Sequence, residues 1–298
     1  MPELPEVETV RAGLERVLVG RRFVRIDQRR RDLRFALPER FAERLAGRRV
    51  ESLGRRAKYI LIRLDNGEVL VVHLGMTGRF SVRAPSRRAG GEGIVLGDYV
   101  YDHGGDARHD HLVFTMSDGS LVTYNDARRF GYMELVPEAE MEGHPFFAGL
   151  GVEPLSDDLT PAYLAARARG RKVDLKALLM DQRIVAGLGN IYVCEALFRA
   201  GLDPFKRAAT LATKTGKAMP AAVRLVAAIK SVLAEAVRAG GSTLRDYKQA
   251  DGSLGRFQNE FAVYGREGQR CLRRGCRGTV RRKVQGGRST FYCPVCQR

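Results

Sequence analysis

The sequence predicts an α+β protein of several domains, with a helix and a β-sandwich first, a helical domain next and a small zinc-binding hairpin last. Three observations support this prediction. Apolar segments of strand length recur between residues 23 and 136, helical patterns dominate from Pro161 onward, and four of the five cysteines lie between residues 271 and 296. We therefore place the domains at residues 1–150, 151–260 and 261–298.

The opening segment, Met1 to Thr9, places a proline second and then begins a helix. Removal of the initiator methionine would expose Pro2 as a secondary amine, and chain-terminal amines titrate at about pH 8, so a fraction is an unprotonated nucleophile at neutral pH. Its neighbour Glu3 could transfer protons at the same centre. The alternative is an ordinary helix start, with Pro5 in the first turn and acidic residues favouring the helix dipole. This segment by itself favours the ordinary start.

Short strands separated by turn residues are expected after this helix, which ends near Gly20. The strands are predicted at residues 23–26, 50–53, 59–64, 69–73, 79–82, 112–116, 121–125 and 132–136. Asp65-Asn66-Gly67 and Asp118-Gly119 are expected to be hairpin turns, and about eight such strands are enough for a sandwich or barrel. A long surface loop, Ala84 to Arg108, interrupts the pattern and could carry a short strand at residues 94–96.

Helices are predicted in the second half of the chain. They span residues 162–169, 175–180, 191–200 and 220–238. The last of these repeats apolar residues at helical spacing, which predicts that it is the packing centre of its domain. The repeated residues are Val223, Val226, Ile229, Val232, Leu233 and Val237. A polar, glycine-rich loop from Ser242 to Asn259 follows, and Cys194 is expected to be a small buried hydrophobic residue.

The chain is strongly basic. It has 51 Lys and Arg against 34 Asp and Glu, a net charge of +17 and a pI near 10.1, which indicates a polyanionic partner. Nucleic acid is the first candidate and an anionic membrane surface is its competitor. No apolar run is long enough to span a membrane, and Glu3, Glu6 and Glu8 stand where a signal peptide would be basic and then apolar. We therefore expect a soluble cytoplasmic monomer without a membrane partner.

The strongest single motif is Cys271-x4-Cys276-x16-Cys293-x2-Cys296. Two close pairs of cysteines separated by a hairpin-sized insert supply four thiolates for one tetrahedral zinc ion. Strands are expected at residues 278–284 and 289–292, meeting at a turn that displays Arg288 at its tip. A purely structural zinc, replacing a core that so small a module cannot build, explains the cysteines. It does not explain the displayed arginine.

Weaker motifs have two interpretations each. Gly187-Leu188-Gly189-Asn190 could hold a phosphate at a helix start or be an ordinary turn. Arg55 to Lys58 could be an exposed charge run or contain a phosphate-binding or catalytic lysine. His109-Asp110-His111 has metal-ligand residue types, but a solvated strand edge or phosphate contacts are favoured over a second metal. Taken singly, Met76, Arg128 and Phe130 would pass as core or surface residues.

Six motifs in one order are more specific than any of them alone. They are Met1 to Glu8, Arg56 to Tyr59, His73 to Met76, Asn125 to Gly131, Gly187 to Tyr192 and Gly287 to Cys293. By these motifs the chain closely resembles bacterial formamidopyrimidine-DNA glycosylases over nearly its whole length. The resemblance implies a β-sandwich, a helix-two-turn-helix domain and a zinc finger that together bind damaged double-stranded DNA. It also implies a protein located at the bacterial nucleoid.

The resemblance also implies catalytic roles. Pro2, freed of methionine, would attack C1′ of a flipped, oxidised purine nucleotide and form a Schiff base, and Glu3 would protonate the sugar as its ring opens. The two flanking phosphates would then leave by β,δ-elimination. Lys58 matches the family lysine assigned to proton transfer in β-elimination, and Arg288 matches the finger arginine assigned to δ-elimination.

DNA contacts follow from the same resemblance. Met76, Arg128 and Phe130 match residues that fill the space left by the flipped nucleotide, with Arg128 facing the orphaned base, preferentially cytosine. Residues that match phosphate contacts are His73, His109, Arg171 and Asn190, with Lys176 as a weaker candidate. Ser242 to Asn259 matches a loop that closes over the lesion in some members, and Glu6 is expected near the flipped base.

Two departures and two rival functions accompany this interpretation. The first cysteine pair is separated by four residues where the family commonly has two, and the loop at residues 84–108 is longer than usual. An endonuclease VIII-type enzyme would use the same terminal proline on oxidised pyrimidines, but Leu4 favours the purine-directed branch. A non-catalytic zinc protein that binds DNA would not need Pro2, Glu3 and Lys58.

Overall fold

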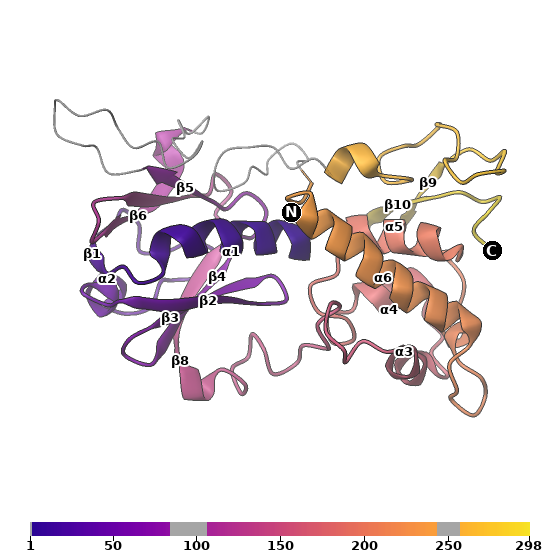
Figure 1. The fold of residues 1–298 in the computed structure, drawn as a ribbon, viewed down its shortest axis with the longest axis horizontal. Coiled ribbons are helices and arrows are strands. Elements are labelled where there is room, and N and C mark those ends of the chain that lie inside the picture. The colour runs from indigo at the N-terminus through magenta and orange to yellow at the C-terminus, as the bar shows by residue number, and fades with distance from the viewer. Residues whose placement is uncertain (1, 84–105, 243–256) are drawn as a thin grey trace. The chain divides into compact units, whose positions relative to one another are not determined.

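The computed structural model describes residues 2–83, 106–242 and 257–298 (Figure 1). The chain divides into two compact units, Met1–Ala148 with Ala239–Arg256, and Gly149–Arg238 with Phe257–Arg298. In this division the C-terminal cysteine module groups with the helical residues, and the residues that follow Arg238 group with the sandwich. The strand expected at residues 94–96 and most of the two expected loops lie outside the described residues.

The first unit is an antiparallel β-sandwich, as the sequence predicts. Its strands are β1 (Phe23–Gln28), β2 (Val50–Arg56), β3 (Tyr59–Leu64), β4 (Glu68–His73), β5 (Arg79–Arg83), β6 (Asp110–Met116), β7 (Leu121–Asn125) and β8 (Tyr132–Pro137). They form two four-stranded sheets with the orders β1-β6-β7-β5 and β2-β3-β4-β8. Both predicted hairpin turns are confirmed, since they join β3 to β4 and β6 to β7.

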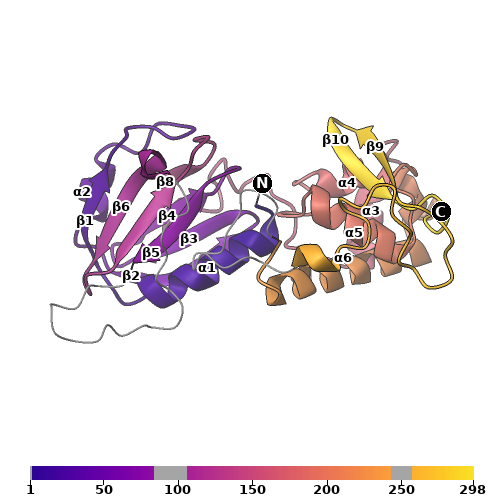
Figure 2. The ribbon, with the colours of Figure 1, turned by 90° about the horizontal axis from the view of Figure 1, so that it is seen from above.

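Helix α1 (Leu4–Leu18) lies against β2 and β3 and helps to close the core (Figure 2). Val7, Val10 and Leu14 are buried in one apolar cluster with side chains from both sheets, because they recur at helical spacing on one face. The five-residue helix α2 (Phe41–Leu45) was not expected from the sequence. Its length is too short to show a helical period, and it forms because Phe41 and Leu45 reach the same core.

The second unit is built around α5 (Asn190–Ala200), in which every residue except Arg199 is buried. The other helices are α3 (Pro161–Ala168), α4 (Leu175–Met180) and α6 (Pro220–Arg238). The prediction that α6 is the packing centre is wrong: it buries one face only, and Val223 is 52% exposed. A long amphipathic helix can cover a core without being its centre.

The C-terminal module adds the hairpin of β9 (Arg281–Gln285) and β10 (Arg288–Tyr292) to the second unit. Glu195 of α5 holds the chain that leads into it, because its buried carboxylate accepts hydrogen bonds of 2.8 to 3.0 Å from the backbone N–H groups of Ala262, Val263 and Tyr264. Short 3₁₀ helices lie at Ala107–His109, Glu138–Glu140, Ala208–Leu211 and Phe257–Glu260. Among the helices described, none combines the length and the apolar character needed to cross a membrane.

Candidate functional site

The N-terminus of α1 presents Pro2 and Glu3 together. Pro2 is buried and Glu3, the N-cap residue, is only 3% exposed. A capping box fixes Glu3: its side chain accepts from the backbone of Glu6, and the Glu6 carboxylate accepts from the backbone N–H of Glu3 at 2.9 Å. The helix dipole favours negative charge at this end. The carboxylate of Glu3 is therefore held in place next in the sequence to Pro2, whose nitrogen is the candidate nucleophile.

Glu6 has a second set of partners within the same unit. Its other carboxylate oxygen accepts from the backbone N–H of Ser242 at 2.8 Å and from the Ser242 hydroxyl at 2.9 Å. Both residues are buried, at 2% and 3% exposure. Glu6 therefore links the first turn of α1 to the point at which the predicted lesion loop begins. Its expected approach to a flipped base stays a prediction.

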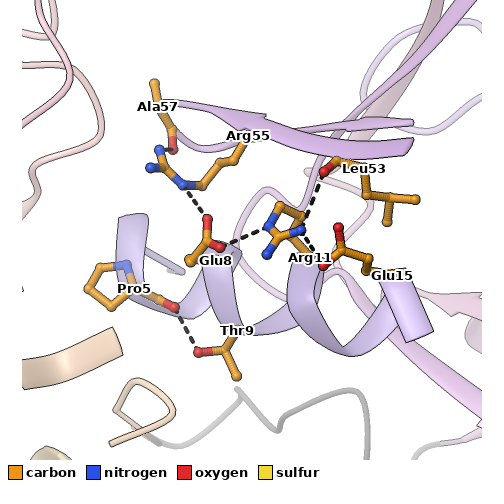
Figure 3. A network of polar contacts seen from close by, with 8 residues as sticks. All are labelled: Pro5, Glu8, Thr9, Arg11, Glu15, Leu53, Arg55 and Ala57. Atoms are coloured by element: carbon orange, nitrogen blue, oxygen red, sulfur yellow. Dashed lines mark hydrogen bonds and ion pairs between the residues drawn. The ribbon is translucent and has the colours of Figure 1, made fainter. Parts of the chain in front are cut away.

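Lys58 lies in the tight turn between β2 and β3, and a network of charged groups holds that turn to α1 (Figure 3). Glu8 of α1 accepts from Arg55 at 2.9 Å, and Arg55 donates onward to the carbonyl of Ala57 at 2.9 Å. Ala57 has a φ of +52°, a strained conformation for a residue with a side chain. Lys58 itself is only 8% exposed, so the interpretation of Arg55 to Lys58 as an exposed charge run is wrong.

His73 is the last residue of β4, opposite Tyr59 of β3. Its ring stacks on Tyr132 with centroids 4.8 Å apart and planes 14° from parallel. Its Nδ1 accepts a hydrogen bond from the backbone N–H of Gly75 at 3.0 Å. Burial lowers the pKa of His73 to about 4, and the positive charges of Lys58 and Arg34 contribute to this lowering. The imidazole is thus neutral at pH 7, and with Nδ1 accepting, the proton is on Nε2.

The pKa of His73 gives a pH dependence of stability. An unfolded histidine titrates at about pH 6.5, above the folded value of about 4, so the unfolded state takes up the proton first. The stability contributed by neutral His73 is complete above about pH 6.5 and falls as the pH drops toward 4. We expect the free energy of unfolding, measured in urea at several pH values, to fall less over this range in His73→Gln than in wild type. Equal pH slopes in the two proteins would contradict the assignment.

The segments that carry Met76, Arg128 and Phe130 come together, although they are distant in the sequence. The turn after β4 and the loop before β8 touch backbone to backbone: a Cβ on Gly75 would lie 2.2 Å from the carbonyl carbon of Phe130. The Arg128 guanidinium lies over the Phe130 ring, 4.6 Å from its centroid. Phe130 is 41% exposed, so its ring is accessible from solvent beside Arg128.

The His109-Asp110-His111 motif does not form a solvated strand edge. Asp110 and His111 are buried, at 9% and 4% exposure, and the Nε2 of His111 lies 2.8 Å from the carbonyl of Asp126. His109 is half-buried, and its carbonyl accepts from the backbone N–H of Asp126 at 3.0 Å. The expectation of a solvated strand edge is wrong because a 3₁₀ helix precedes the strand here and a β-bulge interrupts it.

In the second unit, two of the predicted phosphate contacts hold the strand that begins with Arg288. Lys176 is 2% exposed, and its Nζ donates to the Thr290 hydroxyl at 2.7 Å and to the carbonyl of Ser289 at 3.2 Å. Asn190 Nδ2 donates to the same carbonyl at 2.9 Å. Arg288 itself is exposed, as the first residue of β10. Arg171, also exposed, follows α3.

The four C-terminal cysteines form a compact set. Their sulfur atoms all lie within 4.8 Å of one another, and the pairs Cys271–Cys296 and Cys276–Cys293 are 3.7 Å apart. Four thiolates about 2.3 Å from a tetrahedral zinc ion would be about 3.8 Å apart, so the set fits this metal. The backbone N–H of Gly278 donates to the Cys276 sulfur at 3.3 Å. Cys194, buried as expected, packs in the same apolar cluster but outside the sulfur set.

The four residues that separate Cys271 from Cys276 make a structural contact that the sequence alone did not predict. Arg273, inside the four-residue insert, donates to the carbonyl of Phe198 and, at 3.4 Å, to that of Arg199. Its guanidinium lies over the Phe198 ring at 5.0 Å. These carbonyls belong to the last turn of α5, where a positive charge is favoured by the helix dipole. The four-residue insert between Cys271 and Cys276 therefore anchors the cysteine module to α5.

Three family models match successive parts of the chain. The family described as "Formamidopyrimidine-DNA glycosylase N-terminal domain" matches residues 1–133, and "Formamidopyrimidine-DNA glycosylase H2TH domain" matches residues 150–248. A third, "Zinc finger found in FPG and IleRS", matches residues 268–298. Together the three matches extend from the first residue of the chain to the last.

Relatives and solved structures agree with these matches. A protein named formamidopyrimidine-DNA glycosylase from Chelativorans sp. (strain BNC1) is 56% identical to this chain, and the match covers 100% of both proteins. A protein of the same name from Methylobacterium sp. (strain 4-46) is 58% identical, and the match covers 100% of this chain and 99% of that protein. A crystal structure of the MutM (Fpg) protein from Thermus thermophilus is 39% identical, with a TM-score of 0.78 and coverage of 99% of this chain and 98% of that one. A Lactococcus lactis Fpg variant in complex with a Fapy-dG containing DNA is 32% identical, with a TM-score of 0.81 and full coverage of both chains.

Proposed function

The chain belongs to the formamidopyrimidine-DNA glycosylase family, and from this membership we propose that it is a bifunctional DNA glycosylase and AP lyase. Its proposed substrates are oxidised purines, 8-oxoguanine and formamidopyrimidines, in duplex DNA. The observation that carries this proposal is the capping box of α1, which fixes the buried carboxylate of Glu3, the residue that follows Pro2. A nucleophile and a proton-transfer group at one centre are what a Schiff-base mechanism needs.

In the proposed reaction the free Pro2 nitrogen attacks C1′ of the flipped nucleotide, and the bond from C1′ to the damaged base breaks, with the base taking a proton from water. The Glu3 carboxylate takes up the proton that the nitrogen loses and donates it to the sugar ring oxygen, so that the ring opens and a positively charged iminium joins the protein to C1′. The iminium acidifies C2′, and loss of that proton expels the 3′ phosphate. A second elimination then expels the 5′ phosphate.

Lys58 and Arg288 are the proposed cationic groups for these two eliminations. Lys58 is held in a strained turn that the Glu8–Arg55 pair fastens to α1, and such a turn fixes the position of its backbone before the substrate binds. Arg288 begins a strand that Lys176 and Asn190 secure from the helical side. Fixed positive charge would stabilise a departing phosphate.

DNA binding is proposed through both units. His73, as a neutral Nε2–H donor, and His109 would contact phosphates from the first unit, and Arg171 and Asn190 from the second. Met76, Arg128 and Phe130 would fill the space that the flipped nucleotide leaves, with Arg128 reading the orphaned base. One zinc ion held by the four cysteines would stabilise the finger that carries Arg288. The net charge of +17 supports a polyanionic partner. The protein is proposed to act as a monomer in the bacterial cytoplasm, at the nucleoid.

Borohydride trapping tests the proposed function. Reduction in the presence of duplex DNA containing 8-oxoguanine opposite cytosine should give a covalent protein–DNA adduct, with the sugar remnant on Pro2 by peptide mapping. Undamaged duplex is the control and should give none. A DNA-binding protein without catalytic activity would give no adduct with either duplex, and a preference for thymine glycol over 8-oxoguanine would indicate the endonuclease VIII type instead.

A further inference from the structure

Asp126 directly follows β7 and is fully buried, so its carboxylate is shielded from solvent. Its carboxylate accepts hydrogen bonds from three directions. The Thr77 hydroxyl donates to one oxygen, while the backbone N–H of Gly131 at 2.8 Å and the Tyr124 hydroxyl at 3.3 Å donate to the other. A buried carboxylate is costly unless it is satisfied in this way, so its position is tightly determined.

Thr77 makes this carboxylate into a link between two segments. Its hydroxyl donates to Asp126 and at the same time accepts from the backbone N–H of Arg128 at 3.1 Å. Thr77 follows Met76 directly in the turn after β4, whereas Arg128 lies in the loop before β8. One half-buried hydroxyl therefore fastens the turn that carries Met76 to the loop that carries Arg128 and Phe130.

Two glycines, one in each segment, let the backbone pack closely against a shared side chain, Tyr124. A Cβ on Gly131 would lie 1.8 Å from the Tyr124 hydroxyl, and one on Gly78 would lie 2.4 Å from the same atom. Arg129, between Arg128 and Phe130, has a φ of +54°, which an arginine adopts only when its surroundings impose it. The two segments touch directly at Gly75 and Phe130 and share the Tyr124 hydroxyl at Gly78 and Gly131, so a shift of one segment is passed to the other.

We propose that Thr77 and Asp126 are positioning residues, which join the Met76 turn and the Arg128–Phe130 loop into one preformed wedge. This inference rests on the proposed function, because it concerns how that enzyme fills the space left by a flipped nucleotide and reads the opposite base. Two independent segments would each lose conformational freedom when DNA binds. A wedge already ordered in the free protein avoids that loss and inserts all three side chains in one geometry.

A matched pair of substitutions at Thr77 tests the proposal. Thr77→Val keeps the branched shape but removes the hydroxyl, leaving the Arg128 N–H without its partner, whereas Thr77→Ser keeps the hydroxyl. We expect Thr77→Val to lower kcat/KM for 8-oxoguanine excision from duplex DNA by about tenfold, the effect of one or two hydrogen bonds. The preference for cytosine over adenine opposite the lesion should fall as well. Thr77→Ser should resemble wild type in both measurements.

Cleavage of a single-stranded abasic oligonucleotide separates positioning from simple loss of structure. That substrate has no opposite base and no stacked space to fill, so Thr77→Val should cleave it at the wild-type rate. A parallel loss on the duplex and single-stranded substrates would overturn the proposal, as would duplex excision and base preference equal to those of Thr77→Ser. Failure of the wild-type protein to form any borohydride adduct would instead refute the proposed function.

Discussion

Replacing Pro2 with glycine should lower excision of 8-oxoguanine by about a hundredfold or more while duplex affinity stays within a few-fold of wild type. A secondary amine can only give a permanently charged iminium at C1′, whereas the primary amine of glycine gives an imine that must also be protonated. Loss of the proline ring also removes the rigid connection to Glu3. Single-turnover excision and binding to an uncleavable abasic analogue measure the two effects separately.

Glu3→Gln is the companion substitution at this centre. Glutamine keeps the oxygen that accepts the Glu6 N–H in the capping box, so α1 should begin as in wild type and the melting temperature should change little. It cannot donate an acidic proton, and we expect excision to fall by about 10²- to 10⁴-fold. Wild-type excision by both variants, with Met1 removed as shown by mass spectrometry, would exclude the assigned roles.

Cys293→Ser is expected to have the largest effect on structure. Cys293 is fully buried, and losing one of four thiolates should abolish tight zinc binding and with it the free energy that folds the finger, of which about 10 kcal/mol or more can come from the metal. The strand that begins with Arg288 would lose its support, so strand cleavage and duplex affinity should both fall. Metal content after dialysis, thermal melting with and without chelator, and cleavage assays measure these outcomes.

Cys194→Ala provides the matched control for the metal. This cysteine is equally buried and lies in the same apolar cluster, but outside the four-sulfur set. The variant should retain one equivalent of zinc and lose only a modest amount of stability through a small cavity, about 1 kcal/mol. One equivalent of zinc and an unchanged melting curve in Cys293→Ser would contradict the four-cysteine site.

The sequence by itself determined most of the strands and longer helices and the four-cysteine set, because those features are encoded locally. Strands β3 and β7 and helices α4 and α6 have the predicted bounds, since alternation, helical spacing and turn residues act over a few neighbouring positions. The four cysteines were identifiable because close pairs around a hairpin are a local pattern. The opening segment offered Pro2 and Glu3 as a nucleophile and a proton-transfer group but favoured an ordinary helix start, and the family resemblance supplied their catalytic roles.

Only the tertiary structure decided which residues are buried and what they hold. Lys58 belongs to a basic run that the sequence predicts to be exposed, yet it is buried, in a turn that the Glu8–Arg55 pair connects to α1. Arg273 and α5 acquire their roles through contacts between distant positions. Thr77 and Asp126 are 49 positions apart and show no pattern that joins them. Such pairings depend on how strands and helices pack across the fold, and a linear sequence does not record those distances.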